Sequence, residues 1–294
     1  MPETAAPTIT VAEIYAYWIK SCGGTRLTTA EVTPRGIKHD RRWMVVDADG
    51  QFLTQREIPR MALVRPELDG EWLRLRGRGV RDEVALPVAQ DGPRRLVRVW
   101  NDACPAISDG AEADAWVSGF LETEAHLVHM PDDCVRQDGR RLGQVGFADG
   151  YPFLITCIAS LADLNRRLAD VGEPPLPINR FRPNLVMTGC EAYAEDTWAR
   201  LEIEGVAYAV VKPCVRCPIT TTDQETAARY REPLRTLATY RKTAKGAIFA
   251  QNAVNLGTGT VREGSTVTVM ACQASPLAAE AASIDISRLP ATRG

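Results

Sequence analysis

Histidine is scarce in this chain, and a second pair of closely spaced cysteines is missing. The 294 residues include three histidines, His39, His126 and His129, and Cys214 and Cys217 form the only C-x-x-C pair. A structural zinc site takes four Cys or His ligands at compatible spacing. Zinc therefore stays an alternative for the cysteine pair, but the sequence offers few partners to complete such a site.

The sequence also lacks the motifs of several common enzyme classes. It contains no GxxxxGK[ST] loop, no GxGxxG between a strand and a helix, no GxSxG and no HExxH. These absences argue against a P-loop NTPase, a Rossmann dinucleotide enzyme, an α/β-hydrolase and a zinc protease. The formal net charge is -2 and no aromatic stacking motif is present, so we expect no nucleic-acid partner.

Long apolar runs are absent as well. No stretch approaches the length of a membrane span, and Met1–Ala5 lack the basic and then apolar order of a secretory signal. We therefore expect no membrane span and a cytoplasmic location. The eight cysteines are scattered, which indicates free thiols in a reducing compartment and not a disulfide framework.

The first half of the sequence reads mainly as short strands separated by Gly, Pro and Asp. Ile9–Trp18 alternates in hydrophobicity, and Trp43–Asp47 with Gln51–Thr54 is typical of a hairpin that turns at Ala48–Gly50. Further strands are predicted at Ala62–Arg65, Trp72–Leu75, Val84–Leu86 and Leu96–Trp100. This spacing favours a small β-barrel or sandwich. A helix is predicted at Ala111–Leu121, capped by Ser108 or Asp109, followed by a polar segment, Met130–Gly143, that forms either a loop or a flap.

The second half mixes helices with strands. Ser160–Leu168 has apolar residues at helical spacing behind a serine cap, and Glu232–Tyr240 is also predicted to be helical. Strands are predicted at Asn184–Thr188, Arg200–Ile203, Ala207–Lys212, Ile219–Thr222, Ile248–Asn255, Gly259–Val261 and Thr266–Cys272. From Gln273 the chain becomes rich in Ala and Ser, which predicts a loosely held tail. The whole pattern predicts a β-dominated α+β fold.

The cysteine pair admits three readings besides zinc. A thioredoxin-like pair would precede a helix, but Pro218–Asp223 reads as strand or loop, which argues against it. Two inert buried cysteines are the commonest outcome for a lone pair. The flanking cations Lys212 and Arg216 would instead favour a thiolate, the form that binds soft metals. A single thiolate is enough for a metal whose other ligands come from a bound cofactor.

Cations also recur where the predicted strands begin and end. Lys20 and Ser21 precede a Gly23-Gly24 pair that suits anion binding through backbone N–H groups. Arg41 and Arg182 lie near the starts of later strands. Together with Lys212 and Arg216 these side chains would clamp a phosphate if the fold brings them together. Taken singly, each is more often a surface charge or part of a structural salt bridge.

Seven stretches in one order resemble a single family, the MOSC proteins with an N-terminal MOSC β-barrel domain, which includes the mitochondrial amidoxime-reducing component and its bacterial relatives. These stretches are Tyr17–Cys22, Asp40–Trp43, Phe147–Leu154, Ala159–Asn165, Arg180–Asn184, Cys214–Cys217 with Thr220–Asp223, and Phe249–Asn252. They span nearly the whole chain. The resemblance implies a β-barrel MOSC domain at residues 126–273 interlocked with an N-terminal β-rich domain at residues 1–125, and a flexible tail at residues 274–294.

The resemblance also implies a molybdenum–pyranopterin cofactor, and it carries an association with pyridoxal phosphate binding. It makes Cys217 the metal ligand and the catalytic residue. The implied cofactor-binding residues are Lys20, Ser21, Arg41, Gly150, Tyr151, Arg182, Asn184, Val215, Arg216 and Asn252. Gly150 and Tyr151 stand where some relatives have two hydroxyl side chains, and Val215 where some have Ser, so contacts at Gly150 and Tyr151 would run through backbone groups.

The implied activity is the reduction of N-hydroxylated compounds such as hydroxylamines and amidoximes. No C-x4-C-x2-C ferredoxin spacing follows Cys217, so the electrons would come from a separate ferredoxin-, flavin- or cytochrome-type protein. Two alternatives stay open: a module that binds or carries the molybdenum cofactor without turnover, and a thiol enzyme that uses Cys217 without a metal.

Overall fold

The largest sheet gathers strands from both ends of the chain. In the computed structural model, which describes residues 8–89 and 91–279, its strand order is β19-β14-β15-β17-β12-β13-β1-β2, and β16 pairs with β17. The bounds are β1 (Thr10–Ala16), β2 (Thr25–Leu27), β12 (Phe153–Cys157), β13 (Leu185–Thr188), β14 (Trp198–Ile203), β15 (Val206–Val215), β16 (Lys242–Thr243), β17 (Gly246–Asn255) and β19 (Val267–Cys272).

Three smaller sheets complete the β structure of the described residues. They join β3 (Thr29–Thr33) with β4 (Gly36–Ile37) and β18 (Gly259–Arg262); β5 (Trp43–Val46), β9 (Arg94–Val99), β10 (Asp102–Ser108) and β11 (His126–His129); and β6 (Val64–Asp69), β7 (Trp72–Gly77) and β8 (Glu83–Pro87). The helices are α1 (Ala111–Leu121), α2 (Ile158–Asp170) and α3 (Leu234–Tyr240). The predicted β-dominated α+β fold is confirmed.

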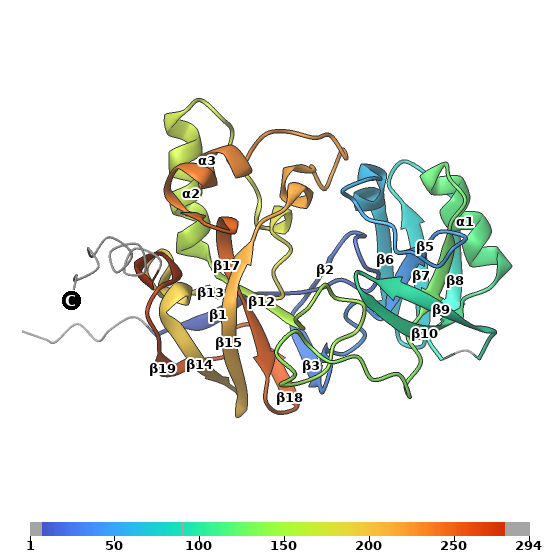
Figure 1. Cartoon of the computed structure of the whole chain (residues 1–294), viewed down its shortest axis with the longest axis horizontal. Coiled ribbons are helices and arrows are strands. Elements are labelled where there is room, and N and C mark those ends of the chain that lie inside the picture. The colour runs from blue at the N-terminus through green and yellow to red at the C-terminus, as the bar shows by residue number, and fades with distance from the viewer. Residues whose placement is uncertain (1–7, 90, 280–294) are drawn as a thin grey trace, which may run out of the picture.

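The first strands of the chain belong spatially to its second half. β1 pairs antiparallel with β13, and β3 pairs antiparallel with β18. Figure 1 shows the blue N-terminal strands β1 and β3 among the strands of the C-terminal half, while β5 to β11 and α1 form a separate group. The two halves are therefore interlocked, as expected. The domain limits at residues 125 and 273 stay predictions.

One continuous apolar core joins the two halves. It includes Ile14 of β1, Leu201 of β14, Leu73 of β7 and Phe120 of α1, all buried. In β7 the buried residues alternate with more exposed ones, as expected for a strand with one face against the core. The ring of Phe120 occupies the place where a side chain at Gly77 would stand, so α1 packs directly on this sheet.

Several local predictions are wrong in an informative way. The bounds predicted for α1 are confirmed, but its N-cap is Gly110 instead of Ser108 or Asp109. Helix α2 begins at Ile158, so Ser160 lies inside the helix and does not cap it. The segment predicted as a strand at Ile219–Thr222 is a 3₁₀ turn, Pro218–Thr221. Proline at the first position of this turn fixes a backbone angle that favours helical geometry.

Other predictions need adjusted limits. Ala62 lies in the 3₁₀ turn Pro59–Leu63, so the strand predicted from Ala62 begins at Val64. The predicted hairpin after β5 has its turn, but its ladder is reduced to one bridge between Val46 and Phe52. The sequence predictions missed seven strands: β2, β3, β4, β10, β11, β12 and β16.

The structure also tests the predictions for two irregular segments, Met130–Gly143 and the segment that begins at Gln273. The polar segment Met130–Gly143 is a loop, and Arg136 within it donates to the carbonyls of Gly146 and Ala148. The prediction of a loose tail is wrong at Gln273, because Gln273 donates to Thr197 O at 2.7 Å and to Trp198 O at 2.7 Å. Residues 280–294 of that prediction lie outside the described residues. No helix in the described ranges has the length and apolarity needed to cross a membrane.

Candidate functional site

Every residue predicted to bind a cofactor lines one cavity of about 180 Å³. The cavity lies where the end of β1, the start of β5, the loop before β12, the loop before β13 and the end of β15 meet. The predicted residues around it are Lys20, Ser21, Arg41, Gly150, Tyr151, Arg182, Asn184, Val215, Arg216, Cys217 and Asn252. With Asn252 of β17, six stretches that are distant in sequence thus converge. What these residues bind stays a prediction.

Cys217 is half-buried at the start of the turn that follows β15. Its Sγ accepts a hydrogen bond from Nη1 of Arg56 at 3.9 Å. The Arg56 guanidinium stacks over the Trp100 ring, 4.5 Å from its centroid. The Arg56 guanidinium is therefore the cation that contacts this sulfur. The sequence reasoning missed Arg56, because nothing local in the sequence links it to Cys217.

The cations that flank the cysteines in sequence do not act on Cys217 as expected. Nη1 of Arg216 donates to Sγ of Cys214 at 3.0 Å, and Nζ of Lys212 lies 4.9 Å from the ring centroid of Tyr151. The prediction that Lys212 and Arg216 act on the Cys217 thiol is therefore wrong. Arg56 takes the place that the sequence assigned to Lys212 and Arg216.

The surroundings of the two thiols bear on the competing interpretations of the pair. Within residues 8–89 and 91–279, no three Cys, His, Asp or Glu side chains cluster in a way that could hold a metal ion. The segment after Cys217 is a four-residue 3₁₀ turn and not the α-helix that a thioredoxin-like pair requires. A metal at Cys217 would thus need its remaining ligands from a bound group.

Tyr17 organises two of the cations and was not among the predicted site residues. Its ring contacts the guanidinium groups of both Arg41 and Arg182, which lie 4.4 Å and 4.2 Å from the ring centroid. Such cation–π contacts hold long side chains in one orientation. The Tyr17 hydroxyl donates to Pro183 O at 3.0 Å. A Cβ at Gly24 would collide with the Tyr17 ring, so this glycine leaves the space that the ring fills.

The expected role of the Gly23-Gly24 pair in anion binding is wrong for Gly23. Its backbone N–H donates to Val64 O at 2.9 Å. A Cβ on this residue would approach that same carbonyl at 2.8 Å. Gly23 is therefore explained by close packing against β6 and not by an anion.

Asn184 is fully buried and positions Arg41. Its Oδ1 accepts from Nη1 of Arg41 at 3.0 Å and from the backbone N–H of Leu154 at 3.2 Å. Its Nδ2 donates to Tyr15 O at 3.1 Å and more weakly to Asp40 at 3.4 Å. Asp40 also forms an ion pair with Arg41. With the amide occupied in this way, Asn184 acts on the cavity by holding the Arg41 guanidinium.

Three of the cavity residues have backbone angles that L-residues rarely adopt. The φ angles are 62° at Ser21, 47° at Arg41 and 56° at Arg182. Positive φ at a residue other than glycine costs of order 1–3 kcal/mol and tends to occur at functional sites. The hydrogen bond from Nη1 of Arg182 to Cys22 O, at 2.6 Å, helps to hold this geometry.

Burial changes the acid–base properties of the cations. Lys20 is buried, and the loss of hydration lowers its pKa, although its ion pair with Asp149 opposes this change. Burial likewise lowers the pKa of Arg182 to about 10. Nε of Arg216 is buried with no hydrogen-bond partner among the described residues, while its Nη2 donates to Phe181 O at 2.8 Å.

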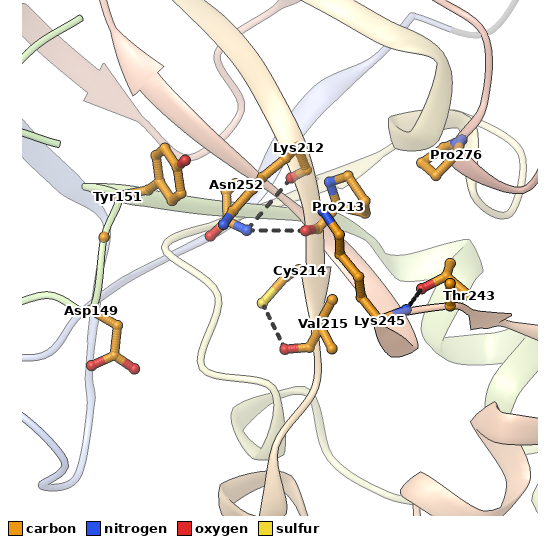
Figure 2. Close-up of a pocket in the computed structure, with 12 residues that line it drawn as sticks. Asp149, Tyr151, Lys212, Pro213, Cys214, Val215, Thr243, Lys245, Asn252 and Pro276 are labelled. Atoms are coloured by element: carbon orange, nitrogen blue, oxygen red, sulfur yellow. Dashed lines mark hydrogen bonds between the residues drawn. The ribbon is translucent and has the colours of Figure 1, made fainter. Parts of the chain in front are cut away.

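A second, larger cavity of about 610 Å³ adjoins the first. The two share Asp149, Gly150, Tyr151, Cys214, Val215 and Asn252. Figure 2 shows β15 running through this region, with Asn252 bonded to the Lys212 and Pro213 carbonyls and with Cys214 below them. The larger cavity also includes Lys245 from the turn between β16 and β17, and Pro276.

Comparison with known proteins matches both halves of the chain to described families. Residues 8–124 match the MOSC N-terminal beta barrel domain, and residues 143–268 match the MOSC domain. Human mitochondrial amidoxime-reducing component 1 is 33% identical over 284 residues, which cover 89% of this chain and 83% of that protein. Human mitochondrial amidoxime reducing component 2 is 36% identical over 247 residues, 79% of this chain and 72% of that protein.

Among solved structures, the YUAD protein from Bacillus subtilis aligns over 88% of this chain and 94% of that chain. Its TM-score is 0.39 and its identity is 9%, a likeness too distant to inform the site.

Proposed function

This chain belongs to the family of MOSC proteins with an N-terminal MOSC β-barrel domain, together with the mitochondrial amidoxime-reducing components, and from that membership we propose that it is a molybdenum-cofactor-dependent reductase of N-hydroxylated compounds. The observation that carries the proposal is the convergence on one cavity of a thiol, Cys217, and four cationic side chains. These cations are Lys20, Arg41, Arg182 and Arg216.

The residues around the cavity fit an anionic group bound through a metal. Lys20 and Arg41 have carboxylate partners, Asp149 and Asp40. In the described chain, no carboxylate is paired with Arg182 or Arg216, and Nε of Arg216 has no acceptor. A buried donor without an acceptor is costly unless a ligand supplies one. A phosphate or another anionic part of a cofactor would supply it.

Cys217 supplies a donor of the right chemical type. Thiolate is a soft ligand suited to a metal that is also held by sulfur of a cofactor. When bound, a molybdenum–pyranopterin cofactor supplies the two-electron redox chemistry that side chains lack. Arg56 contacts the sulfur of Cys217, and Asn184 with Tyr17 would keep the guanidinium groups of Arg41 and Arg182 directed at the cofactor.

The proposed reaction takes up two electrons and two protons. An N-hydroxylated amine or amidoxime loses its N–O bond and gives the amine or amidine and one water. A separate ferredoxin-, flavin- or cytochrome-type protein would deliver the electrons. Pyridoxal phosphate binding finds no support in the comparisons, and the cytoplasmic location stays a prediction.

The decisive experiment measures metal content and turnover in protein from a host that makes molybdenum cofactor. We expect stoichiometric molybdenum in the unaltered protein and in Cys214→Ala, and its loss in Cys217→Ala. The unaltered protein should reduce benzamidoxime to benzamidine with a chemical electron donor. Cys214→Ala is the matched control, because this thiol also lines the cavity and lies in the same motif.

Stoichiometric zinc in place of molybdenum would exclude the proposal. Loss of molybdenum in Cys214→Ala but not in Cys217→Ala would show that the wrong thiol was chosen. Molybdenum without turnover would favour a cofactor carrier, and turnover that survives cofactor removal would favour a thiol enzyme.

A further inference from the structure

The larger cavity differs in character from the one that holds the predicted cofactor ligands. Its lining combines apolar or aromatic surfaces, Tyr151, Pro213, Val215 and Pro276, with the amine groups of Lys212 and Lys245. A volume of about 610 Å³ lies in the range of small-molecule sites, which pair an apolar wall with a few polar anchors. It opens directly beside Cys214 and Val215, which the two cavities share.

The two lysines give this cavity an excess of positive charge. Both are exposed, and no ion pair joins either of them to a carboxylate in the described chain. Among the described residues of the lining, Asp149 is the one acidic residue, and its carboxylate already binds Lys20 and the Trp100 indole N–H. In Figure 2, Lys245 extends from the β16–β17 turn towards Pro213, and Lys212 extends towards Asn252.

The element that carries Lys245 is held in register with the cysteine motif. The backbone N–H of Arg216 donates to Ala247 O at 2.8 Å, and Val215 pairs with Ile248. Gly246, with a φ of 126°, lets the turn approach Val215, since a Cβ there would lie 3.0 Å from the Val215 side chain. The backbone of Lys245 is therefore held next to the end of β15. That strand ends at Val215, two residues before Cys217.

The smaller cavity has cations of its own, which are separate from these two lysines. Lys20, Arg41, Arg182 and Arg216 line the smaller cavity and are all more buried than Lys212 and Lys245. Lys212 and Lys245 are additional cations beside an apolar wall, and they suit a ligand that carries a negative charge.

We infer that the larger cavity is the substrate pocket and that Lys212 and Lys245 select N-hydroxylated compounds bearing an anionic group, a carboxylate or a phosphate. The inference rests on the proposed function and adds the class of substrate. The apolar wall contacts the body of the substrate, the lysines bind the anion, and the N-hydroxyl group reaches the side of the cavity next to the cysteine motif.

The test compares three benzamidoximes that differ only in the 4-substituent: a carboxylate, a phosphate and a neutral carboxamide. The kcat/KM of each is measured for the molybdenum-loaded protein and for Lys212→Gln, Lys245→Gln and the double variant. Lys242→Gln is the matched control, because Lys242 is exposed in the same hairpin and does not line the cavity. Molybdenum content is measured for every variant.

We expect the unaltered protein to prefer at least one anionic compound over the carboxamide, and the double variant to lower that preference by about tenfold, the combined effect of two exposed ion pairs. Added salt should erode the preference, because exposed charges are screened. Lys242→Gln should leave it unchanged. The anionic compound whose kcat/KM falls more in the double variant identifies the natural anionic group.

The outcomes separate the inference from the proposed function. If the loaded protein reduces none of the three compounds, the proposed function fails. If it reduces the carboxamide but shows no anion preference that depends on Lys212 or Lys245, only the inference fails. Loss of molybdenum in the lysine variants would also overturn the inference, since the lysines would then bind the cofactor.

Discussion

Asp149 is the one carboxylate among the described residues that line both cavities, and its protonation is set by its neighbours. It forms an ion pair with Lys20 and accepts from Nε1 of Trp100 at 3.1 Å. Burial raises the pKa of Asp149, but the charge and hydrogen bond of Lys20, with the Trp100 N–H, outweigh it and hold the pKa at about 2.

A pKa below the ordinary value of 3.8 links Asp149 to acid stability. Because the folded-state pKa is depressed, its contribution is fully present above the unfolded pKa and is lost as the pH falls towards about 2. We expect Asp149→Asn to lower the urea midpoint near neutral pH, and the difference from the unaltered protein to shrink as the pH falls from about 4 to about 2. Urea titrations across this range measure it. A difference that stays constant with pH would contradict the assignment.

Some residues of the candidate site could be predicted from the sequence, and others could not. The residue types for a thiolate–cation site could be read from short motifs, because Lys20, Arg182 and Cys217 each lie in one. Arg56 and Tyr17 could not, since their roles come from contacts that span the chain. Arg56 is separated from Cys217 by 161 positions. The tertiary structure determines which cation contacts which thiol.

At the scale of elements, Ser160 shows how tertiary contacts override a local signal. The sequence predicts it as the cap of a helix, but it lies inside α2 and is buried. Its Oγ lies 2.8 Å and 2.9 Å from the two carboxylate oxygens of Glu195 and accepts from the backbone N–H of Tyr193 at 2.8 Å. Burial raises the pKa of Glu195, so this buried carboxyl depends on its hydrogen-bond donors.

We predict that Ser160→Ala lowers the free energy of unfolding by about 1–3 kcal/mol, the cost of removing a partner from a buried polar group. Urea denaturation of both single variants and the double variant forms a mutant cycle with Glu195→Ala. If Ser160 acts through Glu195, its substitution should cost much less in the Glu195→Ala background. Equal costs in the two backgrounds would point to a role in the helix itself.

Which elements could be predicted follows from how strongly their patterns repeat. β1 was recognised from its alternation, and α2 from apolar residues at helical spacing. β10 was missed because Pro105 interrupts its β-forming residues, although this proline pairs with Leu96 inside the sheet. At Thr220–Thr222 the high β-propensity of threonine was misleading, since Pro218 starts a 3₁₀ turn.

At the scale of the whole molecule, the interlocking of the two halves governs folding. β1 lies between β13 and β2, and without it β13 would present an unpaired edge. The same strand leads directly into Lys20 and Ser21 of the cavity. The site is therefore built on a segment that crosses from one half to the other, so its geometry depends on both halves being folded.

This arrangement predicts one unfolding transition for the full chain. Five of the six tryptophans precede residue 125 and Trp198 follows it, so fluorescence reports mainly on the first half, while far-UV circular dichroism reports on both. The two signals should share one urea midpoint.

Ile14→Ala, in buried β1, should lower the free energy of unfolding by about 2–5 kcal/mol and shift both signals together. Leu73→Ala, in buried β7 of the other group of strands, is the matched control and should also shift both. If each substitution moved only one of two separate transitions, the halves would be independent folding units and the shared core would not couple them.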